Sequence, residues 1–346
     1  MKIKLENIGA LKKANVKIDG LTVIAGENDT GKSTLGKALY YGLRVIKIIH
    51  SLPNTEKFSF EHATAAQKCG EIFNVNIMKG LNVDFLVANK IDIDIDSITI
   101  PTIIADGSKN AVSYNDIKPK LKNIKKVPDV LFIETPISLN FFDFFNDINT
   151  LEKRVNSYGE NISIDRPHLL FDLDYHLKIK QKDTDICFVH EEIKNIIDGE
   201  FVVDDMGKLV FLKNNKKIDI VNTATGIKAF GILQILSKNN RLNKNMILVL
   251  DEPEVHLHPK WQLDMARIIV KLVSSGVKIV VNSHSPYMIE ALHRYTDNKK
   301  LRDKSNFYLA KDGAIKDENN ISEIFELLSQ PFDEFDKMDS DILNAK

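Results

Sequence analysis

The segment GENDTGKST at residues 26–34 limits the possible folds of this chain more than any other feature. It matches the pattern G-x-x-x-x-G-K-[ST] at every fixed position. An apolar run, LTVIA at 21–25, precedes it, and apolar residues at 35, 39, 43 and 46 follow it at helical spacing. This order of strand, glycine loop and helix is the context in which backbone N–H groups and a helix N-terminus bind phosphate.

The residue types in this loop predict a nucleotide site, where the alternative is a simple glycine turn before a helix. Gly26 and Gly31 permit the turns that direct N–H groups inward. Lys32 is placed to reach the β- and γ-phosphates, and the hydroxyl of Ser33 is placed to bind Mg²⁺. The predicted binding residues are Gly26, Glu27, Asn28, Asp29, Thr30, Gly31, Lys32, Ser33 and Thr34.

A second motif, MILVLDEPEVHLHP at residues 246–259, places two carboxylates at the end of an apolar strand. Ligands of open α/β sheets bind beyond the carboxyl ends of strands. Asp251 is therefore expected to hold Mg²⁺, directly or through water. Glu252 is expected to orient or deprotonate the attacking water. Alone, such a pair of acids is often a solvated loop, but together with the glycine loop it predicts a hydrolytic site.

His284 follows a further predicted strand, 277–281, in the segment VVNSHSPYM. The interval from Asp251 to His284 has room for one helix and one returning strand. The imidazole is thus expected at the same sheet edge, where it can donate a hydrogen bond to a γ-phosphate. The alternative is a histidine with a structural role in a loop.

Predicted strands alternate with predicted helices in two parts of the chain, 1–47 and 221–318. This alternation indicates an α/β fold with a largely parallel sheet and right-handed crossovers. Residues 48–220 are expected to be an insertion, with antiparallel strands at 83–118, helices at 136–198 and a hairpin at 200–220. Residues 319–346 are expected to form a helical tail.

The motifs GENDTGKST, DEPEVHLHP and NSHSP together resemble the ABC-type ATPases of the SMC, RecF and OLD group. In particular, they resemble the small AAA ATPases with a DEPExxLHP motif that occur in prokaryotic defence systems. This resemblance covers about half of the chain, 1–47 and 221–318. It implies an ABC-type head with an antiparallel β subdomain and a helical lobe. It also implies hydrolysis of ATP to ADP and phosphate, with Mg²⁺, by a homodimer or higher oligomer.

The resemblance also implies a signature loop that faces the nucleotide of a second copy. Residues 223–228, TATGIK, match its position, with Thr225 and Gly226 in place of its Ser-Gly. The segment departs from the usual LSGGQ. In PDVLFIETPISL, residues 128–139, Glu134 stands where a residue contacting metal or water is expected.

Two functions agree with the resemblance. The first is an ATPase that controls a separate effector, a nuclease or toxin, in antiphage defence. Only residues 319–346 follow the last predicted strands, too few for the nuclease domain of OLD-type relatives. The second is a RecF-like ATPase of DNA repair or maintenance that clamps DNA. A transporter subunit is disfavoured by the long insertion and the altered signature.

Composition adds mainly exclusions. With 47 basic and 48 acidic residues the formal net charge is -1, which does not indicate a dedicated nucleic-acid surface. The lysines at 118, 120, 122, 125 and 126 leave nucleic acid open as a partner, although a solvated loop is the commoner explanation.

Cys69 and Cys187 are expected to be reduced. His256 and His258 are expected to shape a dimer contact and not to bind metal. Without a signal peptide or long apolar span, the chain is expected in the cytoplasm, with no membrane partner.

Overall fold

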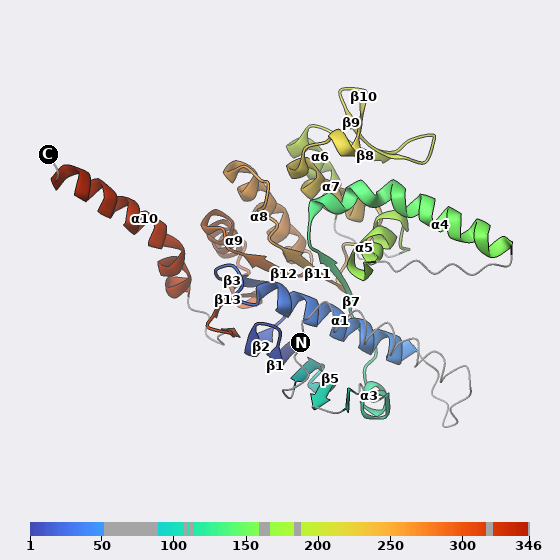
Figure 1. Ribbon diagram of the computed structural model, residues 1–346, viewed down its shortest axis with the longest axis horizontal. Helices are drawn as coiled ribbons and strands as arrows, with labels where there is room; N and C mark the ends of the chain where they lie inside the picture. The colour runs from blue at the N-terminus through green and yellow to red at the C-terminus, as the bar shows by residue number, and fades with distance from the viewer. Residues whose placement is uncertain are drawn as a thin grey trace.

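The fold is organised around one large mixed sheet (Figure 1). The computed structural model describes residues 1–51, 89–106, 109–110, 114–158, 167–182, 188–315 and 321–344. Among these residues, eleven strands form the large sheet in the order β6-β5-β4-β1-β2-β14-β13-β3-β12-β11-β7. Three more strands form a small sheet in the order β10-β9-β8. Cys69 and Cys187 lie outside the described residues.

One half of the large sheet is parallel and buried on both faces. Its five strands are β13 (Ser305–Lys311), β3 (Leu21–Ala25), β12 (Lys278–Ser283), β11 (Met246–Asp251) and β7 (Asp129–Ile133). Val249 and Val280 belong to the core that includes α1 (Lys32–Ser51). Leu248 and Val281 belong to the core on the other face, together with residues of α8 (Pro259–Ser274) and α9 (Pro286–Asn298). Burial on both faces explains why these strands are nearly continuous apolar runs.

The other half of the large sheet is mainly antiparallel. It contains β6 (Lys109–Asn110), β5 (Ile98–Asp106), β4 (Asn89–Ile95), β1 (Lys2–Ile8), β2 (Leu11–Lys17) and β14 (Ala314–Ile315). Strand β14 pairs in parallel with β2 and antiparallel with β13, and so joins the two halves. In β4, Ile91 and Ile93 are buried, whereas Asp94 forms an ion pair with Lys4 at 3.1 Å. In IDIDI, residues 91–95, the isoleucines therefore pack into the core, and Asp92 and Asp94 each pair with a lysine.

A helical lobe with a small sheet covers the end of the large sheet beside β7 and β11. Its elements are η1 (Pro136–Phe141), α4 (Phe142–Ser157), α5 (His168–Lys178), α6 (His190–Ile197), β8 (Glu200–Val203), β9 (Leu209–Lys213), β10 (Lys216–Asp219), η2 (Ile220–Asn222) and α7 (Thr225–Lys238). These elements confirm the helices predicted at 136–198. Strands β8 and β9 form the hairpin predicted at 200–220, and β10 adds a third strand to it. In the FFDFF segment, Phe145 is buried, whereas Phe144 is 53% exposed, so the segment serves the core only in part.

The division into a core of 1–47 and 221–318 and an insertion of 48–220 stays a prediction, but one feature of the sheet bears on it. Strands β4, β5 and β7 come from within 48–220 and nevertheless belong to the large sheet. Strand β7 is only five residues long, DVLFI. An apolar run of that length has no periodicity that distinguishes a strand from part of a buried helix.

The remaining elements lie at the periphery. They are α3 (Tyr114–Leu121), η3 (Arg302–Lys304) and α10 (Ile321–Asn344). Helix α10 starts against the body, where Ile324 is fully buried, and then extends away from it (Figure 1). In the described part of the chain, no helix combines the length and apolar character that crossing a membrane requires.

Candidate functional site

Neighbouring parallel strands end side by side at one edge of the large sheet. Ala25, the last residue of β3, is in register with Ser283 of β12. Asn282 of β12 is in register with Asp251, the last residue of β11. The glycine loop, the loop with His284 and the loop with two acids therefore start next to one another. The three predicted motifs meet at the sheet edge where ligands of α/β proteins bind.

The glycine loop surrounds the ammonium group of Lys32. Lys32 Nζ donates hydrogen bonds to the carbonyl oxygens of Gly26 (3.0 Å) and Glu27 (2.6 Å). Gly31 has a φ of +91°, and a Cβ there would lie 2.6 Å from Leu11 Cδ2, so only glycine fits. Helix α1 begins at Lys32, which brings its first backbone N–H groups to the loop.

The other residues of the loop 26–34 differ in their exposure to solvent. Asp29 has a φ of +61° at the tip, where the backbone turns back toward α1. Thr30 Oγ1 donates to the carbonyl oxygen of Glu27 at 2.8 Å, which closes the turn. The tip is open to solvent, and the first turn of α1 is half-buried. The exposed residues are Glu27, Asn28 and Asp29, and the half-buried residues are Thr30, Ser33 and Thr34.

Ser33, Asp251 and Asn282 come from three elements and form one bonded group. Ser33 Oγ donates to Asp251 Oδ1 at 3.0 Å, and Asn282 Nδ2 donates to the same oxygen at 2.7 Å. Asn282 Oδ1 is buried and has no hydrogen-bond partner among the described residues. Hydroxyl, carboxylate and amide oxygens are the ligand types that Mg²⁺ takes in proteins. The group therefore fits a Mg²⁺ ion by its donor types and by its unsatisfied acceptor.

Burial disfavours the charged forms of two residues at this edge. Burial raises the pKa of the Asp251 carboxyl, although hydrogen bonds from Asn282 and Ser33 oppose the shift. Burial also lowers the pKa of the Lys32 ammonium, which the charges of Glu252 and Asp251 oppose. Both shifts favour the neutral form because a buried charge loses hydration. A cation beside Asp251 and a phosphate beside Lys32 would each supply opposite charge.

Glu252 adopts a left-handed backbone conformation next to His284. Its φ is +49°, a conformation that costs a residue other than glycine about 1 to 3 kcal/mol. Its N–H donates to the carbonyl oxygen of Asn282 at 2.9 Å, which helps to hold this conformation. His284 Nδ1 lies 3.1 Å from Glu252 Oε1. The two side chains are 41% and 33% exposed, respectively, so solvent reaches this pair.

Thr225 and Gly226 lie at the start of α7, with the loop after β11 as their neighbour. A Cβ on Gly226 would lie 3.0 Å from the carbonyl oxygen of His256 and 3.3 Å from Leu257 and Trp261. Gly226 is buried, and Thr225 is half-buried. The structure thus brings Gly226 against the loop that contains His256, whereas Lys32, Ser33, Asp251, Glu252 and His284 gather at the sheet edge.

His258 has a capping role. Its Nδ1 accepts a hydrogen bond from the N–H of Lys260 at 3.2 Å, so His258 caps the N-terminus of α8. Within the described ranges, no group of three or more His, Cys, Asp or Glu residues is placed to hold a metal ion. A metal pair of His256 and His258 gains no support.

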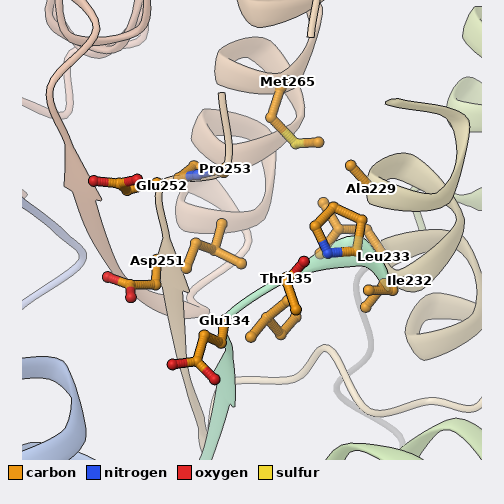
Figure 2. A pocket seen from close by; sticks show the side chains of 12 residues that line it. Glu134, Thr135, Ala229, Ile232, Leu233, Asp251, Glu252, Pro253 and Met265 are labelled. Atoms are coloured by element: carbon orange, nitrogen blue, oxygen red, sulfur yellow. The ribbon is translucent and has the colours of Figure 1, made fainter. Parts of the chain in front are cut away.

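Glu134 also faces this sheet edge. Figure 2 shows the carboxylates of Glu134, Asp251 and Glu252 on one side of the strand ends, with Met265 and apolar side chains of α7 on the other. Glu134 Oε1 accepts a hydrogen bond from Lys37 Nζ of α1 at 2.7 Å. The small pocket behind the carboxylates is lined by Ile133, Glu134, Thr135, Pro136, Ala229, Ile232, Leu233, Leu250, Asp251, Glu252, Pro253 and Met265.

The family model for the AAA ATPase domain matches residues 101–289, more than half of the 346 residues. The chain belongs to the AAA ATPase domain family. The protein is accordingly an ATPase. Asp251, Glu252 and His284 of this ATPase lie within the matched range, and the glycine loop lies before it.

Two curated relatives resemble this ATPase. The Retron Vc95 probable ATPase of Vibrio cholerae serotype O1 biovar El Tor is 26% identical over 243 residues, which covers 59% of this chain and 43% of the relative. The Old nuclease of Escherichia phage P2 is 32% identical over 63 residues, which covers 18% of this chain and 11% of the relative. The ATPase therefore matches less than half the length of either relative.

The solved structures that this chain resembles include an SMC head domain and an ATP-binding cassette. The SMC head domain from Thermotoga maritima is 12% identical, with a TM-score of 0.41, over 91% of this chain and 96% of that one. An ATP-binding cassette of an ABC transporter, in its ADP conformation, is 14% identical, with a TM-score of 0.39, over 96% of both chains.

Sequence reasoning missed two residues of the candidate site. Asn282 bonds Asp251, and Glu254 is buried beside His284. Each stands inside a quoted motif, Asn282 in NSHSP and Glu254 in DEPEVHLHP. The signal for Asn282 was its place as the last polar residue of a buried strand, next in space to the strand that ends at Asp251.

Proposed function

We propose that this ATPase closes a homodimer around ATP and that the closed dimer controls a separately encoded effector, a nuclease or toxin, in prokaryotic antiphage defence. The observation that carries the ATP chemistry is the contact of Ser33 with Asp251 and of Glu252 with His284 at adjacent strand ends. The defence role is supported by the motif resemblance and by the names of the relatives, a retron ATPase and a phage nuclease.

In the proposed site, the loop 26–34 and the N-terminus of α1 bind the phosphates of ATP. Lys32 exchanges its bonds to Gly26 and Glu27 for bonds to β- and γ-phosphate oxygens. Ser33 and Asp251 hold Mg²⁺, with Asn282 orienting the Asp251 carboxylate. The ion, when bound, neutralises charge that develops on the β- and γ-phosphate oxygens.

Glu252 and His284 are proposed to act on the attacking water and on the γ-phosphate. Glu252 Oε1 contacts His284 Nδ1, which leaves Glu252 Oε2 to accept a proton from water. In its protonated form, His284 donates from Nδ1 to Glu252 and has Nε2–H available for a phosphate oxygen. The side chains share the edge with Lys32, so the water and the γ-phosphate would lie between them.

The dimer is proposed from the start of α7. Helix α7 begins at Thr225, and its N-cap residue, Ala224, has no side-chain cap. The first N–H groups of such a helix suit a phosphate. A second copy would supply that phosphate, and each copy would complete the other's site in a closed two-fold arrangement.

The alternative, a RecF-like ATPase that clamps DNA, gains no support from the lysines at 118 and 120. Lys118 Nζ donates to the carbonyl oxygen of Ile49 at 3.0 Å and is buried. Lys120 Nζ donates to the carbonyl oxygen of Thr99 at 3.2 Å. Two of the five candidate phosphate contacts therefore bond the protein itself.

The proposal is tested by capture of partners from the native host with tagged Glu252→Gln and ATP. Glu252→Gln should hold ATP without hydrolysing it, and Lys32→Ala, which should not bind ATP, is the matched control. We expect a stoichiometric protein partner with Glu252→Gln only. Nucleic acid alone would favour the DNA-clamp function, and equal capture by Lys32→Ala would contradict control by ATP.

A further inference from the structure

Glu254 is a buried acid three residues after Asp251, in the loop between β11 and α8. Its side chain is 4% exposed. One oxygen, Oε1, accepts three hydrogen bonds: from Ser283 Oγ at 2.6 Å, from the N–H of His284 at 3.0 Å and from the N–H of Ser285 at 3.2 Å. The other oxygen, Oε2, is buried and has no hydrogen-bond partner among the described residues.

These three donors belong to consecutive residues, the last residue of β12 and the first two residues after it. Ser285 is also the N-cap of α9, where its Oγ accepts a hydrogen bond from the N–H of Met288. Glu254 Oε1 therefore binds the short turn between the end of β12 and the start of α9. His284 is the middle residue of that turn, so its backbone position depends directly on Glu254.

The same turn sets the distance between His284 and Glu252. His284 Nδ1 lies 3.1 Å from Glu252 Oε1 and 3.8 Å from Glu254 Oε1. Both the backbone and the side chain of His284 thus contact the loop after β11. Glu252 itself is held from the same strand end, because its N–H donates to Asn282.

A carboxylate is a costly choice for packing alone. Burial raises the pKa of the Glu254 carboxyl, although the bonds from Ser283 and His284 oppose the shift. An apolar residue of similar size would fill this space without that cost. What an apolar residue could not do is accept the backbone N–H of His284, which would lose the acceptor that Oε1 supplies. The N–H of Ser285 would keep Ser283 Oγ, at 3.1 Å, as its acceptor.

We infer that Glu254 is a positioning residue for ATP hydrolysis, which fixes the backbone of His284 so that its imidazole stays against Glu252. This inference rests on the proposed function, since it assumes that Glu252 and His284 act on water and phosphate. ATP binding depends on other groups: Lys32 bonds Gly26 and Glu27, and Ser33 bonds Asp251. Glu254 therefore sets kcat and leaves the KM for ATP nearly unchanged.

Two conservative variants separate positioning from charge. Glu254→Gln removes the charge but keeps an acceptor oxygen at the same reach. Glu254→Asp keeps the charge but shortens the side chain by one methylene, which withdraws the acceptor from the turn. A misplacement of about 1 Å can cost roughly 100-fold in rate. We expect Glu254→Asp to lose about this factor in kcat, and Glu254→Gln to stay within about 5-fold of the unchanged protein.

The measurement is steady-state ATP hydrolysis by the full chain, with kcat and KM determined separately and with a thermal melt of each variant. Both variants should bind ATP within about 3-fold of the unchanged protein, because the phosphate-binding residues are untouched. Glu254→Ala, which removes both acceptor oxygens, should lose at least as much kcat as Glu254→Asp. If Glu254→Ala fails to fold, the comparison of Glu254→Gln with Glu254→Asp still tests the positioning role.

Three results would overturn the inference: a normal kcat in Glu254→Asp, a kcat lost in Glu254→Gln as much as in Glu254→Asp, or an increase in KM alone. Glu252→Gln, measured in parallel, separates this failure from failure of the proposed function. If Glu252→Gln hydrolyses ATP normally, the proposed function is wrong. If Glu252→Gln is inactive while Glu254→Asp keeps its kcat, only the role of Glu254 is wrong.

Discussion

Helix α1 carries two groups of polar side chains in very different surroundings. At its start, Lys32 and Ser33 lie at the sheet edge with Asp251. About two and three turns later, Tyr40 and Arg44 contact Asp172 of α5, which is 4% exposed. Tyr40 Oη donates to Asp172 Oδ2 at 3.0 Å, and Arg44 donates to Oδ1 at 2.6 Å.

The difference is in how far the protein compensates its own charges. Burial moves the pKa of Lys32 downward and that of Asp251 upward, each toward the neutral form. Asp172, in contrast, accepts hydrogen bonds from the guanidinium of Arg44 and the hydroxyl of Tyr40. Buried charges whose pKa values are shifted toward the neutral form, such as those of Lys32 and Asp251, are typical of a ligand site. A buried cluster with all its hydrogen bonds made instead stabilises the packing of one element against another. The Tyr40–Asp172 cluster thus fastens the helical lobe to α1.

Among these variants, the largest effect on ATP turnover is expected from Asp251→Asn. Loss of the carboxylate should lower Mg²⁺-dependent ATP turnover by about 1000-fold, or about 4 kcal/mol. The ligand-free protein should melt at the same or a higher temperature. The reason is the raised pKa of Asp251: at neutral pH its charged form costs folding free energy, which the neutral amide avoids. A melting temperature lowered as far as turnover would contradict a site built for a ligand.

Arg44→Ala should show the opposite pattern. Removal of the guanidinium leaves Asp172 buried without its cation, which should lower the free energy of unfolding by about 3 kcal/mol. Lys47→Ala, one turn further along α1, is the matched control. Lys47 pairs with Asp129 at 2.7 Å and is 41% exposed, and Asp129 is 15% exposed, so the loss of Lys47 should cost less than the loss of Arg44, about 1 kcal/mol. Denaturant titration of both variants measures the difference, and equal losses would refute a special role for the cluster.

His176, also on α5, should make the stability of the protein depend on pH. Burial lowers the pKa of His176 to about 4, from a usual value of 6.5. Between these values the unfolded chain binds a proton that the folded protein does not. The free energy of unfolding should therefore fall as the pH falls from about 6.5 to about 4, by at most about 3 kcal/mol from this residue. His176→Leu should have a smaller loss over this range, and an identical profile would show that His176 is not responsible.

The sequence predicted the parts of the fold that short motifs determine. The strands at 21–25 and 246–250, the helix after the glycine loop and the convergence of Lys32, Asp251 and His284 all follow from contiguous segments. The α/β class with a largely parallel core was predicted for the same reason. The roles of Thr225 and Gly226 rest on family resemblance and remain predictions.

What the sequence did not reveal depends on contacts between distant residues. Tyr40 and Asp172 are 132 residues apart, and no local pattern joins them. Glu254 was missed for another reason: in DEPEVHLHP, Asp251 and Glu252 already had assigned roles, and no role was sought for a third acid. Its burial and its three donors exist only once β11 and β12 lie side by side.

In the proposed site, Glu252 activates water, whereas other residues bind ATP. The most direct test compares ATP affinity and single-turnover hydrolysis in Glu252→Gln and in the unchanged protein. We expect a dissociation constant within about 3-fold and hydrolysis slower by about 1000-fold, within the range for loss of a general base. Hydrolysis at the normal rate in Glu252→Gln would contradict this role of Glu252.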